Sequence, residues 1–228
     1  MPIRTYDPKE ARKRSVDNLQ RLYTFVVSLA ITEMLRRMLS PMSMEYGRWL
    51  MFVSFLSTVV PFYHGANRYL DATYVTGERS AKHFALMFDF IFLFFEALLL
   101  FALAMQAANR EWFYTLLAIL FVFDAIWVGF TNLTGENPRD RVPRYTKWAI
   151  VNVCAAAALM ISVWSNVIGE FWANDVVKNI AVVIVAVGRS VYDYMSVWSF
   201  YYPPGDETPR YDDIPAPRPA RPPSSAAA

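Results

Sequence analysis

Two carboxylic acids, Asp89 and Glu96, interrupt an otherwise apolar run between Phe84 and Met105. A run of this length can cross the hydrocarbon core of a bilayer, which takes about 20 helical residues. Acids inside such a span are costly and rare, and they commonly mark a functional site. Their spacing of seven residues places them on one face of a helix, together with Lys82. The chemistry that this pattern indicates is the binding of a proton or a cation within a membrane.

Four further polar residues interrupt other apolar runs: Asp124, Asn152, Arg189 and Asp193. With a rise of about 1.5 Å per residue, the four acids and Arg189 lie roughly 10 to 21 Å from the inner ends of their helices. Arg189 is the one permanent cation in this layer, so it cannot neutralise all four acids. We expect Arg189 to face inward and pair with Asp124 or Glu96. The surplus acids must then be protonated, hydrated or paired with a bound cation. Alternatively, the polar groups only lock the helices together.

A second polar group lies where the second apolar run ends. Its predicted members are His64, Asn67, Arg68, Asp71 and His83. Helical spacing aligns the first four, and a short connection returns His83 to them, so we expect one polar pocket at the cytoplasmic face. Histidine titrates near neutral pH and arginine binds phosphate, which suits a gate, a proton relay or a lipid-headgroup site. The alternative is a capped helix end with Arg68 reaching lipid phosphate. We predict no metal at this site.

The elements that must position these residues are long apolar helices. The chain has 228 residues, of which 55% are hydrophobic and 18% charged. Its apolar runs are continuous and lack the alternation of strands. We therefore predict an all-α, polytopic membrane protein with a bundle of about six transmembrane helices. The expected spans are 20–39, 47–70, 82–106, 111–132, 145–168 and 175–200, and Pro61 should kink the second.

Charge sets the expected orientation and the division of the chain. Residues 1–19 form a basic N-terminal segment, 20–202 the six-helix domain, and 203–228 a disordered tail rich in Pro and Ala. An N-terminal helix should begin at Asp7 and Pro8. Few basic residues fall in the outer segments; those that do are Arg36, Arg37, Arg48, Arg110 and Lys178. Because positive charge favours the cytoplasmic side, both termini should be cytoplasmic, in what we expect to be a bacterial inner membrane.

Smaller features add little chemistry. Glu33 should pair locally with Arg36 and Arg37. The aromatic residues near span ends, such as Trp49, Trp112, Trp148, Trp172 and Tyr201, fit aromatic belts at the membrane interfaces. The sequence has no phosphate-binding loop and no GxGxxG, HExxH or GxSxG motif, and we expect no cofactor and no nucleic-acid partner.

Three functions fit these patterns. The leading hypothesis is a proton- or cation-coupled channel or carrier that uses the intramembrane acids. The first alternative is a structural or accessory subunit of a larger membrane complex. The second is an intramembrane enzyme that modifies a lipid, with His64, Arg68 and Asp71 at headgroup level. The expected partners are the lipid bilayer, a proton or cation, and either further copies of this chain or a larger membrane complex.

Overall fold

The computed structural model describes residues 8–39, 46–76, 82, 84–134, 143–164 and 175–202. Within these residues every regular element is a helix, as the all-α prediction requires. The helices are α1 (Pro8–Met38), α2 (Tyr46–Leu70), α3 (Ala85–Met105), α4 (Arg110–Thr134), α5 (Pro143–Trp164), α7 (Asp175–Ser196) and α8 (Trp198–Tyr201). A π-helical turn, η1 (Asp71–Val75), continues α2 without a break.

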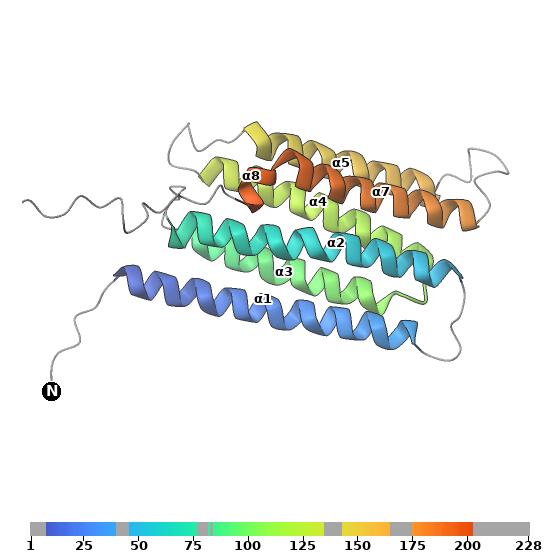
Figure 1. Cartoon of the computed structure of the whole chain (residues 1–228), viewed down its shortest axis with the longest axis horizontal. Helices are drawn as coiled ribbons and strands as arrows, with labels where there is room; N and C mark the ends of the chain where they lie inside the picture. The colour runs from blue at the N-terminus through green and yellow to red at the C-terminus, as the bar shows by residue number, and fades with distance from the viewer. Residues whose placement is uncertain are drawn as a thin grey trace, which may run out of the picture.

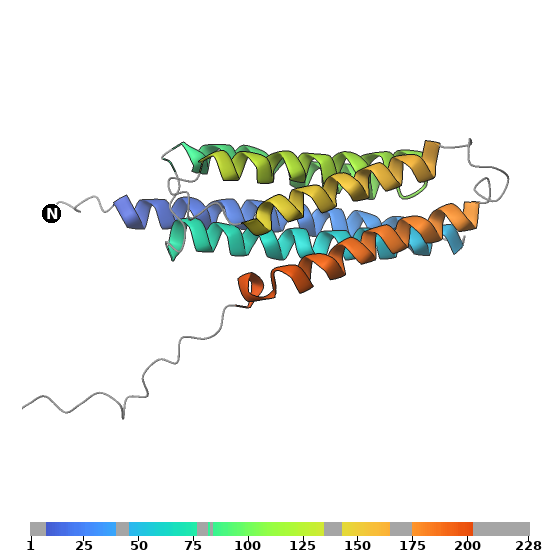
Figure 2. The same ribbon diagram turned by 90° about the horizontal axis from the view of Figure 1, so that it is seen from above.

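The six long helices lie side by side, and each runs opposite to the one before it in the chain (Figure 1). Their main contacts form a closed ring in the order α1, α3, α4, α5, α7, α2 and back to α1. The start of α1 and the end of α8 lie at the same end of the bundle (Figures 1 and 2). We call this the N-terminal end of the bundle. It also holds the end of α2, the start of α3 and the end of α4.

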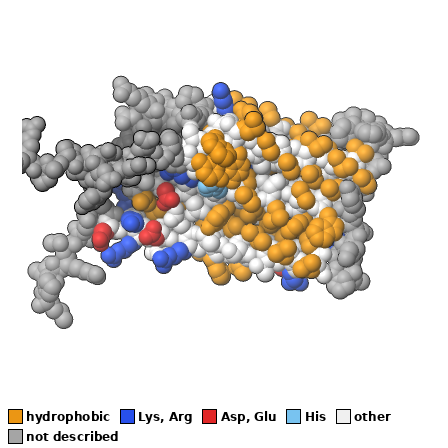
Figure 3. Space-filling model, in the orientation of Figure 1, with side chains coloured by type: hydrophobic (Ala, Val, Ile, Leu, Met, Phe, Trp, Pro, Cys, Tyr) orange, Lys and Arg blue, Asp and Glu red, His pale blue; other side chains and the backbone are white. Residues whose placement is uncertain are grey.

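The bundle has an apolar core, but unlike a water-soluble bundle it also has an apolar surface and several buried charged groups. Large apolar side chains point outward, for example Met87 and Phe95, which are 57% and 51% exposed. Polar side chains lie inside, including Asn152 and Asp193, which are at most 1% exposed. On the face seen in Figure 3, hydrophobic side chains cover most of the described surface, and charged side chains gather toward the N-terminal end. Such an arrangement suits surroundings of lipid.

Four helical segments are long and apolar enough to cross a membrane: Gly47–Val75, Ala85–Met105, Arg110–Leu133 and Thr146–Val163. They support a membrane protein and match four of the six predicted spans. The remaining two predicted spans are helices, α1 and α7, but neither combines the length, the hydropathy and the low number of charged residues of these four segments. Six crossings and cytoplasmic termini therefore stay predictions.

Three local predictions, for the start of α1, the pairing of Glu33 and the C-terminal tail, can be compared with the structure. The helix α1 begins at Pro8, as expected, and continues unbroken for 31 residues, so the predicted boundary at residue 20 falls inside it. Glu33 does pair with its neighbours, at 2.8 Å from Arg36 and 2.5 Å from Arg37. The predicted tail, 203–228, lies outside the described residues.

The aromatic-belt interpretation is wrong for two residues. Trp148 and Tyr201 are buried, and Tyr201 donates a hydrogen bond to Asp193 inside the bundle. Trp49 and Trp112 do lie at the surface, while Trp172 falls outside the described residues. An indole or phenol near a span end suits the interface and the bundle interior equally well, because both offer an apolar wall and a polar partner.

Candidate functional site: a buried acidic network

Every long helix supplies a side chain to one network inside the ring. The contributors are Tyr23 of α1, Phe62 of α2, Glu96 of α3, Asp124 of α4, Asn152 of α5 and Arg189 of α7. All six are nearly inaccessible to solvent. The offset between neighbouring helices along the bundle axis decides which of their residues meet at the same depth. The ring of six helices therefore positions this network as a whole.

Arg189 is the cation at the centre of the network. Its Nε donates to Oδ1 of Asn152 at 2.8 Å. Its two terminal nitrogens lie 3.5 Å from Oδ2 of Asp124 and 3.6 Å from Oδ2 of Asp193. Asn152 also donates from Nδ2 to Asp124, so the amide bridges the cation and the acid. The guanidinium lies over the rings of Phe62, 4.5 Å from the centroid, and Phe121, at 5.5 Å, where it gains cation–π attraction.

The terminal nitrogens of Arg189 make long ion-pair contacts and no hydrogen bond within the described residues. One carboxyl oxygen of Asp193, Oδ1, is likewise buried without a hydrogen-bond partner there. The other, Oδ2, accepts from the hydroxyl of Tyr201 in α8 at 2.8 Å. Unsatisfied donors and acceptors side by side are costly in an apolar interior, so a small rearrangement or a bound water would stabilise this part of the network.

Glu96 enters the same network without touching Arg189 directly. The hydroxyl of Tyr23 donates to its carboxyl group. Glu96 remains within electrostatic range of both Asp124 and Arg189. The single cation at the centre thus faces three carboxyl groups, and two of them are in ion-pair contact with it. Glu96 is the third, and its direct partner is neutral.

Asp89 lies apart from this network, although the sequence places both in one layer. Its Oδ1 accepts from Nε1 of Trp127 at 2.9 Å. Its Oδ2 accepts from the hydroxyls of Tyr69 at 3.1 Å and Tyr74 at 2.5 Å. Three donors on two oxygens give a carboxylate strong local support. Asp89 therefore has its own set of partners, which does not include Arg189 in the contacts described.

The π-helical turn explains how Tyr69 and Tyr74 reach the same oxygen. In an α-helix, residues five apart point about 140° away from each other, since a turn takes 3.6 residues. In η1 the hydrogen bonds instead join residues five apart, as between the N–H of Thr76 and the carbonyl of Asp71 at 2.9 Å. The wider turn brings Tyr74 round toward the side of Tyr69. Such turns are rare and often occur at functional sites.

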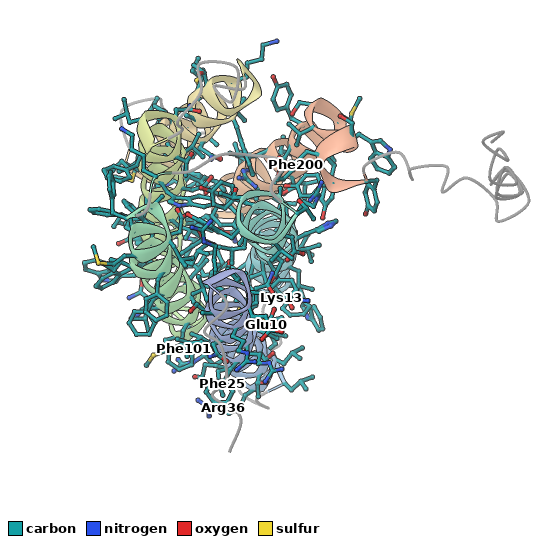
Figure 4. The ribbon with its side chains drawn as sticks, turned by 90° about the vertical axis from the view of Figure 1, so that its left-hand side faces the viewer. Glu10, Lys13, Phe25, Arg36, Phe101 and Phe200 are labelled. Carbon is teal, nitrogen blue, oxygen red and sulfur yellow. The ribbon has the colours of Figure 1, made fainter. Side chains whose placement is uncertain are left out.

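The predicted pocket residues of α2 divide between two neighbours. His64 and Arg68 face α7 and α8: Nδ1 of His64 lies 3.3 Å from the hydroxyl of Tyr194, and Nε of Arg68 donates to the carbonyl of Phe200 at 2.8 Å. The His64 ring also packs on Tyr201, with centroids 4.7 Å apart. Figure 4 looks along the bundle from its N-terminal end and shows Phe200 beside α2 on this side.

Asn67 and Asp71 face α1 instead. Nε2 of Gln20 donates to Oδ1 of Asp71 at 3.0 Å and approaches the carbonyl of Asn67 at 3.4 Å. His83, the fifth predicted member, lies outside the described residues. A single pocket that joins all five residues therefore stays a prediction. In the described contacts, His64 and Arg68 form one group with α7 and α8, whereas Asn67 and Asp71 form another with α1.

The sequence interpretation missed the tyrosines. Buried hydroxyls donate to Glu96, Asp89 and Asp193, and that of Tyr114 donates to Asn179 of α7. A signal for Tyr23 was present, because it falls in the buried stripe of α1 that also contains Leu19, Val27, Ala30 and Met34. A tyrosine in the inward stripe of a helix predicts a polar partner across the bundle.

The arrangement can hold and release a proton, because three carboxyl groups share one guanidinium in an interior that disfavours uncompensated charge. Comparison with known proteins adds no assignment. The chain matches no protein-family model, no curated protein and no solved structure.

Proposed function

We propose that this chain is a six-span membrane protein with cytoplasmic termini, and that its buried acidic network binds and releases a proton as the protein conducts protons across the membrane. In this proposal Glu96 is the proton-binding residue. The polar framework beside Glu96 consists of Asp124, Asn152, Arg189 and Asp193. Asp89 serves to stabilise the bundle through its three aromatic donors.

The distribution of side chains on α7 supports six spans. Its outward side chains are apolar and recur at helical spacing: Val176, Ile180, Ile184 and Val191 are between 41% and 65% exposed. Its polar residues, among them Arg189 and Asp193, are buried. The charged residues Arg189 and Asp193, which help to set α7 apart from the four apolar segments, therefore face the bundle interior and not the lipid. The outer face of α7 is as apolar as lipid contact requires.

The outer face of α1 is likewise apolar over the second part of the helix. Phe25 and Leu29 are 61% and 42% exposed, and Figure 4 shows Phe25 pointing away from the bundle. Its first turns carry exposed charges, including Arg12, Lys13 and Arg14. A helix of 31 residues is long enough, at about 1.5 Å per residue, both to cross the bilayer and to project beyond it.

One observation carries the proton-binding role: three buried carboxyl groups surround one buried cation. If all three were ionised, the network would hold two uncompensated negative charges in a medium that stabilises them poorly. A proton on the acid that lacks contact with Arg189 removes one of these charges at the least cost in ion pairing. That acid is Glu96. A proton held in this way can be exchanged when the bundle changes shape.

The first alternative, an accessory subunit, keeps the same network as a purely structural feature. The lipid-modifying enzyme has less support, because His64 and Arg68 contact α7 and α8 whereas Asp71 contacts α1. Three residues that face two neighbours do not form one catalytic group in this arrangement.

The test is proton flux into proteoliposomes under an imposed membrane potential, followed with an enclosed pH-sensitive dye. Wild type should acidify the lumen, and Glu96→Gln should abolish the flux while the protein stays folded. Glu33→Gln is the matched control, because Glu33 pairs locally with Arg36 and Arg37 away from the network, and it should leave the flux intact. Wild-type vesicles that are no more permeable to protons than empty ones would rule out the transport function and favour the accessory subunit.

A further inference from the structure

An open groove of about 630 Å³ lies between α1 and α2, in the half of the bundle nearer its N-terminal end. Its lining residues are Asp17, Gln20, Arg21, Thr24 and Phe25 from α1, with Tyr63 and Asn67 from α2, and all but Phe25 carry a polar group. Two other grooves among the described helices, between α4 and α5 and between α2 and α7, are lined mainly by apolar side chains. The groove between α1 and α2 offers far more polar surface than the other two, so it is the one that suits water, whereas the apolar ones suit lipid chains.

The rim of the groove carries charge. Asp17 and Arg21 stand one helical turn apart, and Arg21 is exposed. At the same rim, Gln20 connects to Asp71, directly after the end of α2. Charged and amide groups at the rim favour a continuous water column from the membrane surface inward, because each of them is best solvated by water.

The deep end of the groove lies next to the acidic network. Tyr63 lines the groove, and its hydroxyl lies 3.0 Å from Oγ1 of Thr24. The ring of Tyr63 is parallel to that of Tyr23, with an interplanar angle of 5° and centroids 6.0 Å apart. Tyr23 is 2% exposed, and its hydroxyl donates to Glu96. Tyr63 therefore stands between the groove and Tyr23, which contacts Glu96.

We infer that the groove between α1 and α2 is the aqueous inlet through which protons reach Glu96, and that Tyr63 is its gate. This inference rests on the proposed function and adds the route and the side of entry. When the Tyr63 hydroxyl leaves Thr24, water reaches the hydroxyl of Tyr23. Tyr23 then gives its proton to the carboxylate of Glu96 and takes one from a hydronium ion in that water. The net step converts the hydronium ion to water, protonates Glu96 and regenerates the phenol.

Thiol labelling tests the inlet in the full-length protein in proteoliposomes. The native Cys154 is exposed on α5 and is first replaced by Ala. Thr24→Cys then places a thiol in the groove, and Phe95→Cys places one on the outer face of α3. Depth is matched, because Tyr23 and Glu96, the neighbours of these positions, are hydrogen-bonded to each other. The probe is a membrane-impermeant, cationic methanethiosulfonate.

The inlet predicts that Thr24→Cys reacts about tenfold faster than Phe95→Cys or more, because the reactive thiolate forms in water and not in lipid. Labelling should also lower proton flux relative to the same variant before labelling. Asn67→Cys, on the opposite wall, should behave like Thr24→Cys and serves as a second position should the first variant fold poorly.

The failure of the inlet is distinguishable from the failure of the proposed function. If wild type shows flux that depends on Glu96, but groove thiols react no faster than Phe95→Cys and labelling leaves flux unchanged, the inlet is overturned and the function stands. If wild type shows no flux before any labelling, the function fails and the proton route fails with it.

Discussion

The hydroxyl of Ser190 on α7 lies 2.5 Å from the backbone carbonyl oxygen of Ser57 on α2. This carbonyl is the one that Pro61, four residues later, leaves without its helical donor, because proline has no N–H. The same hydroxyl lies 2.9 Å from the carbonyl of Ala186 in its own helix, and it can donate to one of the two at a time. The gap in α2 thus becomes a point of attachment for α7.

We expect Ser190→Ala to destabilise the protein by about 1 kcal/mol, the usual contribution of such a hydrogen bond. The cost should shrink in a Pro61→Ala background, because alanine supplies the missing N–H to Ser57. A double-mutant cycle, measured by denaturation in mixed micelles, gives the coupling between the two positions. Equal costs of Ser190→Ala in both backgrounds would show that the hydroxyl does not serve the carbonyl of Ser57.

Arg189→Met should destabilise the fold by about 3–5 kcal/mol, because it leaves Asp124 and Asp193 buried without their cation. Adding Asp124→Asn should recover part of this loss by removing one of the unpaired charges. The control is Arg36→Met, whose partner Glu33 keeps Arg37, so its effect should stay within about 0.5 kcal/mol. Thermal unfolding in detergent measures all three. Arg189→Met as stable as Arg36→Met would mean that the network is not held by ion pairing.

The partners of Asp89 predict a graded series. Tyr74→Phe removes one of its three donors and should cost about 1–2 kcal/mol. Asp89→Asn should cost more. The amide NH2 of asparagine cannot accept a hydrogen bond, so at least one of these tyrosine or tryptophan donors would lose its acceptor. Tyr192→Phe, at an exposed tyrosine, is the control and should be neutral. If Asp89→Asn were milder than Tyr74→Phe in unfolding experiments, the proposed structural role of this acid would be wrong.

Reporter fusions after residues 42, 76, 108, 138 and 171 test the number of crossings. Six spans with cytoplasmic termini predict cytoplasmic signals at 76 and 138 and the opposite at 42, 108 and 171. If α1 lay on the membrane instead of crossing it, position 42 would report the same side as the N-terminus. A cytoplasmic signal at 108 or 171 would contradict the proposed topology.

Much of the fold follows from the sequence because lipid imposes simple demands. Long apolar runs predicted most of the long helices to within a few residues, as in the third, expected over 82–106 and found at Ala85–Met105, whereas α1 begins twelve residues before its predicted span. The inward direction of Asp89 and Glu96 also follows from their shared face, and both are buried. Neither result needs knowledge of which helices are neighbours.

The partners of these acids depend on neighbours, and here the sequence falls short. Depth along a helix places Asp89 and Asp124 in one layer, but Asp89 meets α4 at Trp127, about one turn nearer the N-terminal end than Asp124. The π-turn that brings Tyr74 to Asp89 has no sequence pattern as clear as a capping box. Tyr201, which the aromatic-belt interpretation places at the membrane interface, turns inward and donates to the buried carboxyl group of Asp193.

An exchangeable proton on Glu96 would be detected most directly by infrared spectroscopy of the protein in lipid bilayers. The C=O stretching band of a protonated carboxyl group is separate from the bands of carboxylates and amides. Wild type at neutral pH should show this band, and it should shift when H2O is replaced by D2O. Glu96→Gln should lose most of its intensity, whereas Glu33→Gln should retain it. A wild-type spectrum without the band at neutral pH, or a band of equal intensity in Glu96→Gln, would contradict a proton held at this site.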